Sequence, residues 1–126
     1  MSLKKTEILR SRNLFKRIAL EGRRIDGTLI RSAFLVHDED GAQLRVGFKV
    51  SSRKLNAVWR NRIRRLMREG VDAERGIVDE LLRRKDLHVG IIIFYKGTKE
   101  LLVGRLKLAV IQKDIGQICR IITSAL

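Results

Sequence analysis

The stretch that decides the fold of this chain runs from residue 44 to residue 69 and reads LRVGFKVSSRKLNAVWRNRIRRLMRE. Residues 44–51 alternate between apolar side chains and polar or small ones, which predicts a strand with one buried face. Asn56 is a suitable N-cap residue, so we expect a helix from there to about Glu69. The chain therefore passes from a strand into a strongly basic helix.

A helical wheel separates this basic helix into two sides. Its apolar side, which is sized to pack on the domain's own sheet, consists of Trp59, Ile63, Leu66 and Met67. Its arginine side consists of Arg60, Arg64 and Arg68, with Asn61 and Arg65 beside them and Arg62 between the two sides. Like charges four residues apart destabilise a helix by roughly 0.2–0.5 kcal/mol per pair. Acidic residues would relieve this repulsion, but no Asp or Glu occurs from Gly41 to Arg68. The uncompensated arginines indicate an anionic partner.

The composition of the whole chain points the same way. Its 28 Lys and Arg against 14 Asp and Glu give a net charge of +14, so a polyanion is the natural partner. Nucleic acid is the first candidate and an anionic membrane surface is the second. The length of 126 residues and the hydrophobic fraction of 44% predict a single domain over residues 1–126. Because no apolar run has the length of a signal peptide or membrane span, we expect a soluble, cytoplasmic protein.

The remaining segments predict an α+β fold. Leu29 to His37 and Gln43 to Ser51 flank an acidic turn, which predicts an antiparallel hairpin. Leu87 to Tyr95 is too apolar to be half exposed and should form a central strand. Further helices are expected over Arg10 to Leu20 and Leu106 to Ala125.

Two more segments complete the predicted order of elements. A short strand is expected near Arg23 to Thr28, and Val71 to Lys85 either continues the basic helix or forms a second helical stretch. The order is then α-β-β-β-α-β-α, with three helices on a mixed sheet of about four strands. We predict a two-layer α/β sandwich.

The sequence does not indicate catalytic residues in this chain. His37 and His88 stand outside any recognisable catalytic motif, and we expect both to be structural. Cys119 is the only cysteine, so a disulfide or a multi-cysteine metal site within the chain is excluded. We predict no catalytic residue and no metal site in the protein itself.

The quoted stretch resembles the diagnostic block of the bacterial ribonuclease P protein family. That family has a strand of the form R-V-G-x-x-V-S, a basic connection and a helix reading N-A-V-x-R-N-R-I-[KR]-R-x-x-R-E. The matching residues here are Arg45-Val46-Gly47, Val50-Ser51, Asn56-Ala57-Val58, Arg60-Asn61-Arg62-Ile63-Arg64-Arg65 and Arg68. Elsewhere the resemblance covers Phe15, Gly22, Ile111, Asp114, Ile115, Ile118 and Cys119.

The chain departs from the family pattern at three places. The family usually has a second aromatic residue four positions after the helical Phe, where this chain has Ala19. Its basic connection, K-[KR]-x-G-N, is replaced by Ser52-Arg53-Lys54-Leu55-Asn56. Residues 103–107 lengthen the approach to the last helix.

The resemblance implies a left-handed β-α-β crossover around the arginine helix and a role in tRNA 5′ maturation. Family members bind the large catalytic RNA of ribonuclease P, one protein per RNA, and help it remove the 5′ leader of precursor tRNA. The chain would then be the accessory subunit of an endoribonuclease, with the chemistry carried by the RNA and its Mg²⁺ ions. We expect neither a membrane nor DNA as a partner.

Two sets of residues follow from these arguments. We expect the catalytic RNA to be contacted by Arg53, Lys54, Arg60, Asn61, Arg62, Arg64, Arg65 and Arg68. We expect the single-stranded leader to be contacted by Arg12, Phe15, Lys16, Arg45, Lys49 and Ser51. Core packing is an open alternative for Phe15, and Trp59 is expected in the core.

Two other classes of protein remain possible. An RNA-binding module such as a ribosomal protein would share the charge and the α+β class. A DNA-binding helix-turn-helix protein would share the basic helix, but there a short helix and not an alternating strand precedes it.

Overall fold

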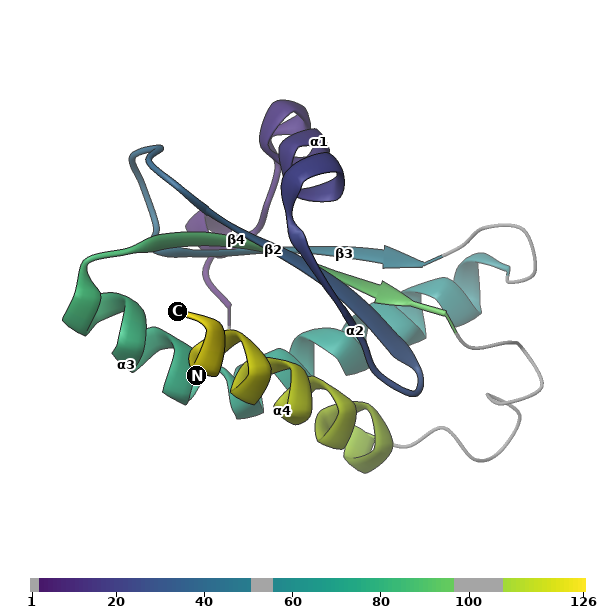
Figure 1. The fold of residues 1–126 in the computed structure, drawn as a ribbon. Coiled ribbons are helices and arrows are strands. Elements are labelled where there is room, and N and C mark those ends of the chain that lie inside the picture. The colour runs from purple at the N-terminus through teal and green to yellow at the C-terminus, as the bar shows by residue number, and fades with distance from the viewer. Residues whose placement is uncertain (1–2, 51–55, 97–107) are drawn as a thin grey trace.

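The computed structural model describes residues 3–50, 56–96 and 108–126, and Figure 1 shows the arrangement of their elements. The helices and strands are, in chain order, η1 (Lys5–Glu7), α1 (Arg12–Glu21), β1 (Arg23–Asp26), β2 (Ile30–His37), β3 (Leu44–Val50), α2 (Ala57–Glu74), α3 (Gly76–Lys85), β4 (His88–Tyr95) and α4 (Leu108–Ala125). The four strands form one mixed sheet in the order β1-β2-β4-β3. The predicted α+β class and the mixed four-stranded sheet are confirmed.

Strand β4 lies in the interior of the sheet, as its apolar sequence predicted. It is antiparallel to β2, where Phe34 pairs with Ile91, and parallel to β3, where Val46 pairs with the same residue. The predicted hairpin between the second and third strands is therefore wrong, since β4 lies between them. The reason is that β4 is apolar on both faces and gains most from a central place. The hairpin in this fold joins β1 to β2 instead.

The helices cover both faces of the sheet. Helices α2, α3 and α4 lie on one face and α1 lies on the other (Figure 1). The described residues contain four α-helices where three were expected, because the long helical region divides at Arg75 into α2 and α3. Helix α1 adds a partial third layer to the predicted two. Helices α2 and α3 connect the parallel strands β3 and β4, which confirms the β-α-β crossover. The left-handedness of this crossover stays a prediction.

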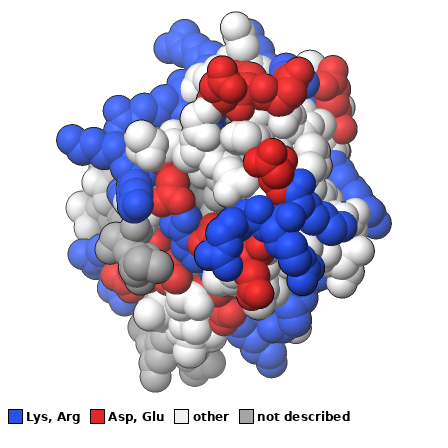
Figure 2. Space-filling view, turned by 90° about the vertical axis from the view of Figure 1, so that its left-hand side faces the viewer, with Lys and Arg blue, Asp and Glu red and all other residues white. Residues whose placement is uncertain are grey.

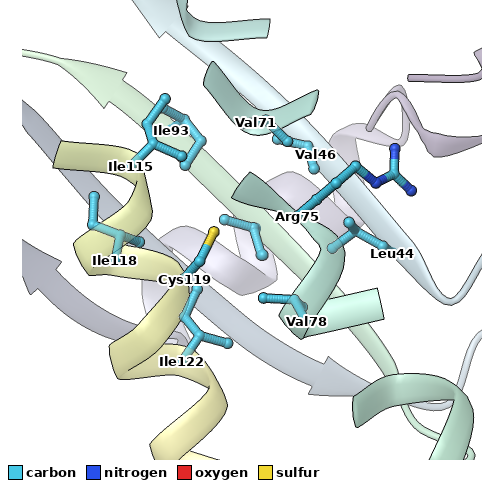
Figure 3. Close-up of a pocket in the computed structure, with 11 residues that line it drawn as sticks. Leu44, Val46, Val71, Arg75, Val78, Ile93, Ile115, Ile118, Cys119 and Ile122 are labelled. Atoms are coloured by element: carbon cyan, nitrogen blue, oxygen red, sulfur yellow. The ribbon is translucent and has the colours of Figure 1, made fainter. Parts of the chain in front are cut away.

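The main hydrophobic core lies between the sheet and helices α2, α3 and α4, and β4 gives it Val89, Ile91, Ile93 and Tyr95. On the opposite face a smaller cluster packs under α1, where Ile92 meets Leu9, Leu14 and Ile18. Figure 3 shows the centre of the main core, in which a cavity of about 10 Å³ remains. Such a volume holds at most about one water molecule, so this cavity is a packing gap and not a ligand site.

Asp114 ties helix α4 to the turn between β1 and β2. Its carboxylate accepts hydrogen bonds from the backbone N–H groups of Thr28 (3.0 Å), Leu29 (2.8 Å) and Ile30 (2.7 Å). A Cβ atom at Gly27 would lie 2.4 Å from Oδ1 of Asp114, so the close approach needs glycine at that position. The buried carboxylate therefore satisfies three donors of the turn and fixes α4 against the sheet.

Arg75, at the break between α2 and α3, holds the N-terminal segment in place. Its Nη1 donates to Oε1 of Glu7 at 3.1 Å, its Nη2 donates to Oε2 of Glu7, and its Nε donates to Oδ2 of Asp79 at 2.7 Å. The Arg75 side chain is only 12% exposed, and Figure 3 shows its nitrogen atoms pointing away from the apolar core. Two residues beyond Glu7, the N–H of Leu9 donates to the carbonyl of Val46 at 2.9 Å, which attaches the segment to the edge of β3.

Replacing Glu7 by Gln should lower the free energy of unfolding by about 1–3 kcal/mol at neutral pH, because a charge-assisted pair with Arg75 is lost. The hydrogen bonds from Arg75 lower the pKa of the Glu7 carboxyl below its ordinary value of 4.5. Its stabilisation is therefore complete above 4.5 and is lost as the pH falls through the lower, folded-state pKa. Denaturant unfolding of both proteins over a series of pH values measures this.

The wild type and Glu7→Gln should converge in acid. Glu80→Gln removes an exposed carboxyl from α3 and is the matched control, expected to follow the wild type at every pH. A stability gap for Glu7→Gln that persists unchanged in acid would contradict the assignment to the ion pair.

Candidate RNA interface

Helix α2 presents its arginine side to solvent because its apolar side is fixed in the core. Asn56 caps the helix, accepting a hydrogen bond from the N–H of Trp59 at 3.0 Å, as predicted. Ile63 and Met67 are fully buried, and Trp59 and Leu66 pack partly buried against the same core. Consequently the outward side of α2 carries exposed Arg62, Arg64, Arg65 and Arg68 and partly exposed Arg60.

Four of the predicted residues line one surface hollow on α2. They are Asn61, Arg64, Arg65 and Arg68, which share the hollow with Leu3, Glu69 and Asp72. Nη1 of Arg64 donates to Oδ1 of Asn61 at 3.5 Å, which orients one guanidinium within the group. Three planar guanidinium groups around one hollow suit bidentate binding of the phosphate groups of a nucleic acid.

Arg62 lies apart from this hollow, beside Trp59. Its guanidinium carbon is 5.7 Å from the centre of the Trp59 ring, a cation–π contact that holds the arginine over the indole. Arg60 is not among the residues that line the hollow. Arg53 and Lys54, the other two residues predicted for this surface, lie outside the described residues.

A second basic surface lies on the opposite face of the sheet, beside α1. A groove there is lined by Phe15, Ala19, Arg24, Arg31, Ser32, Ala33, Lys49, Ile92 and Phe94. Phe15 lies over Gly47 of β3 beside this groove: a Cβ atom at Gly47 would lie 3.4 Å from Cε2 of Phe15, an ordinary contact, and a tighter 3.1 Å from Cδ2 of Leu9. Two of the predicted leader residues, Phe15 and Lys49, are thus brought together in one groove.

The other predicted leader residues are placed differently. Arg12 and Lys16 are exposed on α1 but do not line the groove. Arg45 turns away to the connection between β2 and β3, where its guanidinium donates to the carbonyl oxygen of Asp40. Ser51 lies outside the described residues.

The groove also contains residues that the sequence reasoning missed. Arg24, Arg31 and Phe94 line it, although none belonged to the basic stretch or to the family motif. Strand pairing brings them in: Phe94 of β4 has Arg31 of β2 on one side and Lys49 of β3 on the other. The sequence signal that could have found Phe94 is alternation in β4, since Ile93 and Tyr95 point into the core.

The far end of the same face carries the two histidines. His37 and His88 pair across β2 and β4 with ring centres 6.0 Å apart. Burial lowers the pKa of His37, and nearby Arg45 lowers it further. In the part of the chain that the structure describes, no three His, Cys, Asp or Glu side chains are grouped to hold a metal ion.

Charge is not spread evenly over the molecule. Figure 2 shows the end that lies at the left of Figure 1, where acidic side chains gather along the upper edge and basic ones lie among them. Asp38, Glu39 and Asp40 belong to the connection between β2 and β3 at this end. Helix α2 begins at the opposite end, within the acid-free stretch from Gly41 to Arg68 (Figure 1). Among the described helices, none is long and apolar enough to cross a bilayer.

The family model described as Ribonuclease P matches residues 3–116. The chain belongs to this family. Ribonuclease P proteins are components of an endoribonuclease, and the resemblance seen in the basic stretch is therefore confirmed. No curated protein sequence matches the chain.

Solved structures of ribonuclease P proteins share the fold. The Staphylococcus aureus protein is similar with a TM-score of 0.71 and 22% identity, over 93% of this chain and 95% of that one. The Thermotoga maritima protein is similar with a TM-score of 0.70 and 21% identity, over 90% of this chain and 94% of that one. Because these identities are low, the similarity shows a shared fold only. The assignment of the candidate site residues rests on the geometry described above.

Reversing two arginines of the α2 hollow should weaken binding to a structured bacterial ribonuclease P RNA. We expect Arg64→Glu with Arg65→Glu to lower the affinity on the order of tenfold or more in about 0.1 M salt, because two phosphate contacts become repulsive. The slope of log affinity against log salt concentration should fall by about 2. Filter binding over a salt series measures both quantities.

The control for this experiment is Arg83→Glu with Arg84→Glu, which changes the net charge equally on exposed residues of α3. This control should lower the affinity for the RNA much less than the α2 double variant does, since electrostatic attraction is screened beyond about 10 Å at this ionic strength. Equal losses in the two double variants would show that net charge, and not the α2 hollow, governs binding.

Proposed function

We propose that this chain is the protein subunit that binds the catalytic RNA of ribonuclease P and the 5′ leader of precursor tRNA. It assists the endonucleolytic removal of that leader in tRNA 5′ maturation. One observation carries the proposal. An arginine-lined hollow on α2 and a groove with aromatic and basic side chains lie on opposite sides of one sheet. Two RNA segments can therefore be bound at once without competing for the same surface.

The α2 hollow is suited to the catalytic RNA. Arg64, Arg65 and Arg68 stand on a rigid helix whose apolar side is held in the core, so their spacing is fixed before binding. Arginine forks bind phosphate oxygens in pairs, and releasing counterions from the RNA favours the complex. Such contacts position a folded RNA without reading its sequence.

The groove is suited to a single strand. An unpaired leader exposes the faces of its bases, and stacking on an aromatic ring such as Phe15 is worth about 1–3 kcal/mol per base. Lys49 lies in the same groove and can neutralise a backbone phosphate. The leader would then be held while the remainder of the precursor lies against the catalytic RNA.

The protein contributes binding and positioning in this scheme. We assign hydrolysis to the catalytic RNA and its Mg²⁺ ions, as the family implies. Basic side chains placed between two polyanions reduce their mutual repulsion, so less Mg²⁺ is needed for the substrate to bind. We propose one protein per RNA, acting in the cytoplasm.

The structure argues against one of the two alternative classes of protein but does not distinguish the other from the proposal. Strand β3, and not a short helix, is the described element that directly precedes α2, which argues against a helix-turn-helix DNA-binding protein. A ribosomal-type RNA-binding module would share the charged helix and the sheet, and only a functional assay separates it from the proposal.

The assay is cleavage of a precursor tRNA by a bacterial ribonuclease P RNA at low Mg²⁺, with and without the protein. The wild-type chain should stimulate cleavage, because it supplies cations to a reaction short of them. Arg64→Glu with Arg65→Glu should remove the stimulation, whereas Arg83→Glu with Arg84→Glu should retain it. Binding of the catalytic RNA with no stimulation would favour the RNA-binding module and refute the proposed function.

A further inference from the structure

The groove beside α1 lacks one of the aromatic residues that its family pattern contains, and the structure shows what stands there. Ala19 replaces the second aromatic of α1, and its methyl group lines the groove together with the methyl group of Ala33 from β2. Two small side chains therefore line the groove where the family pattern has a second aromatic ring. A second aromatic ring of this groove comes from β4 instead, since Phe94 lines it as well.

We propose that Phe94 supplies the second stacking surface of the groove and binds a further base of the leader, with Arg31 and Arg24 on adjacent phosphates. The leader would then contact β4, β2 and β1 in addition to Phe15 of α1 and Lys49 of β3. This inference rests on the proposed binding of the leader, and it adds residues that the family motif does not contain.

Packing does not account for an aromatic residue at this position. Ile93 and Tyr95, the neighbours of Phe94, are buried in the main core, and Ile92 is buried under α1. Phe94 is only partly buried and belongs to neither hydrophobic cluster of the described residues. Part of its ring surface therefore remains accessible in the groove, where it is available to a ligand.

Basic residues flank the Phe94 ring on both neighbouring strands. Lys49, Phe94, Arg31 and Asp26 form one row across the four strands, as the pairing register shows. Nε of Arg31 donates to Oδ1 of Asp26 at 2.9 Å, and both side chains are largely exposed. Exposed pairs of this kind are weak, so a phosphate can compete for the guanidinium. Arg24, opposite Ala33 in the register, is exposed on the next strand.

The two aromatic rings remain available for stacking. Among the described residues the aromatic ring pair is His37 with His88, at the far end of the sheet, so Phe15 and Phe94 do not pack on each other. Phe15 packs partly against the cluster under α1, and both rings line the groove, so a base in the groove can contact either ring. An aromatic surface flanked by cations is the arrangement that binds single strands without strong sequence preference.

The test uses the holoenzyme assembled from a bacterial ribonuclease P RNA and the full chain. Phe94→Leu keeps an apolar side chain but removes the ring. Its affinity for a precursor tRNA with a leader of several unpaired nucleotides should fall roughly 5- to 100-fold, the equivalent of one lost stack. Affinity for mature tRNA, which has no leader, and for the catalytic RNA should stay at the wild-type value.

Phe48→Leu is the matched control, because it makes the same change on the other face of the sheet, where Phe48 packs against the main core. It should leave leader affinity unchanged. Leaders in which a single nucleotide lacks its base then locate the stacked base. At one leader position, removal of the base should weaken binding to the wild-type protein but should not weaken binding to Phe94→Leu any further.

Two outcomes would overturn the inference in distinguishable ways. If Phe15→Leu weakens leader binding and Phe94→Leu does not, the groove binds the leader without Phe94 and only this inference is wrong. If neither variant changes leader binding, the groove is not the leader site and that half of the proposed function fails as well.

Discussion

The burial of strand β4 on both faces and its pairing on both edges constrain the rest of this structure. Because β4 runs parallel to β3, the chain between them has to cross one face of the sheet, and α2 and α3 make that crossing. Because the other face of β4 is also apolar, a second cover is needed there, and α1 supplies it through Leu14 and Ile18. The arginine side of α2 and the groove beside α1 are thus set on opposite faces by the same strand.

Local pattern predicted those parts of the fold that depend on one segment. The helical wheel of α2 placed Ile63 and Met67 in the core and the arginines outside, and the side chain of Asn56 caps the helix as expected. The apolar run of β4 predicted a central strand. The false hairpin between β2 and β3 shows the limit of local pattern. Leu44 of β3 pairs with Val89, 45 residues later, and Phe34 of β2 pairs with Ile91, 57 residues later. Nothing in β2 and β3 themselves indicates that β4 lies between them.

The candidate site was predictable to a similar extent. Asn61, Arg64, Arg65 and Arg68 of the arginine hollow lie within one helix, so their spacing predicted them, whereas Leu3, Glu69 and Asp72 of the same hollow were not predicted. The groove is assembled from α1, β2, β3 and β4, and Arg24, Arg31 and Phe94 meet Phe15 only through the register of the strands. Arg45 shares its strand face with Lys49 but is drawn to the carbonyl of Asp40, a tertiary contact that alternation does not reveal.

If opposite faces of one sheet bind different RNAs, photo-crosslinkers placed on the two faces should label different molecules. Arg65→Cys in the α2 hollow and Arg12→Cys on α1 give two single attachment points. The natural Cys119 is buried, and burial raises the pKa of its thiol to about 11, so an added surface thiol reacts selectively. In a holoenzyme with bound precursor tRNA, position 65 should crosslink to the catalytic RNA and position 12 to the 5′ leader. Crosslinks from both positions to the same RNA segment would contradict this division of the two faces.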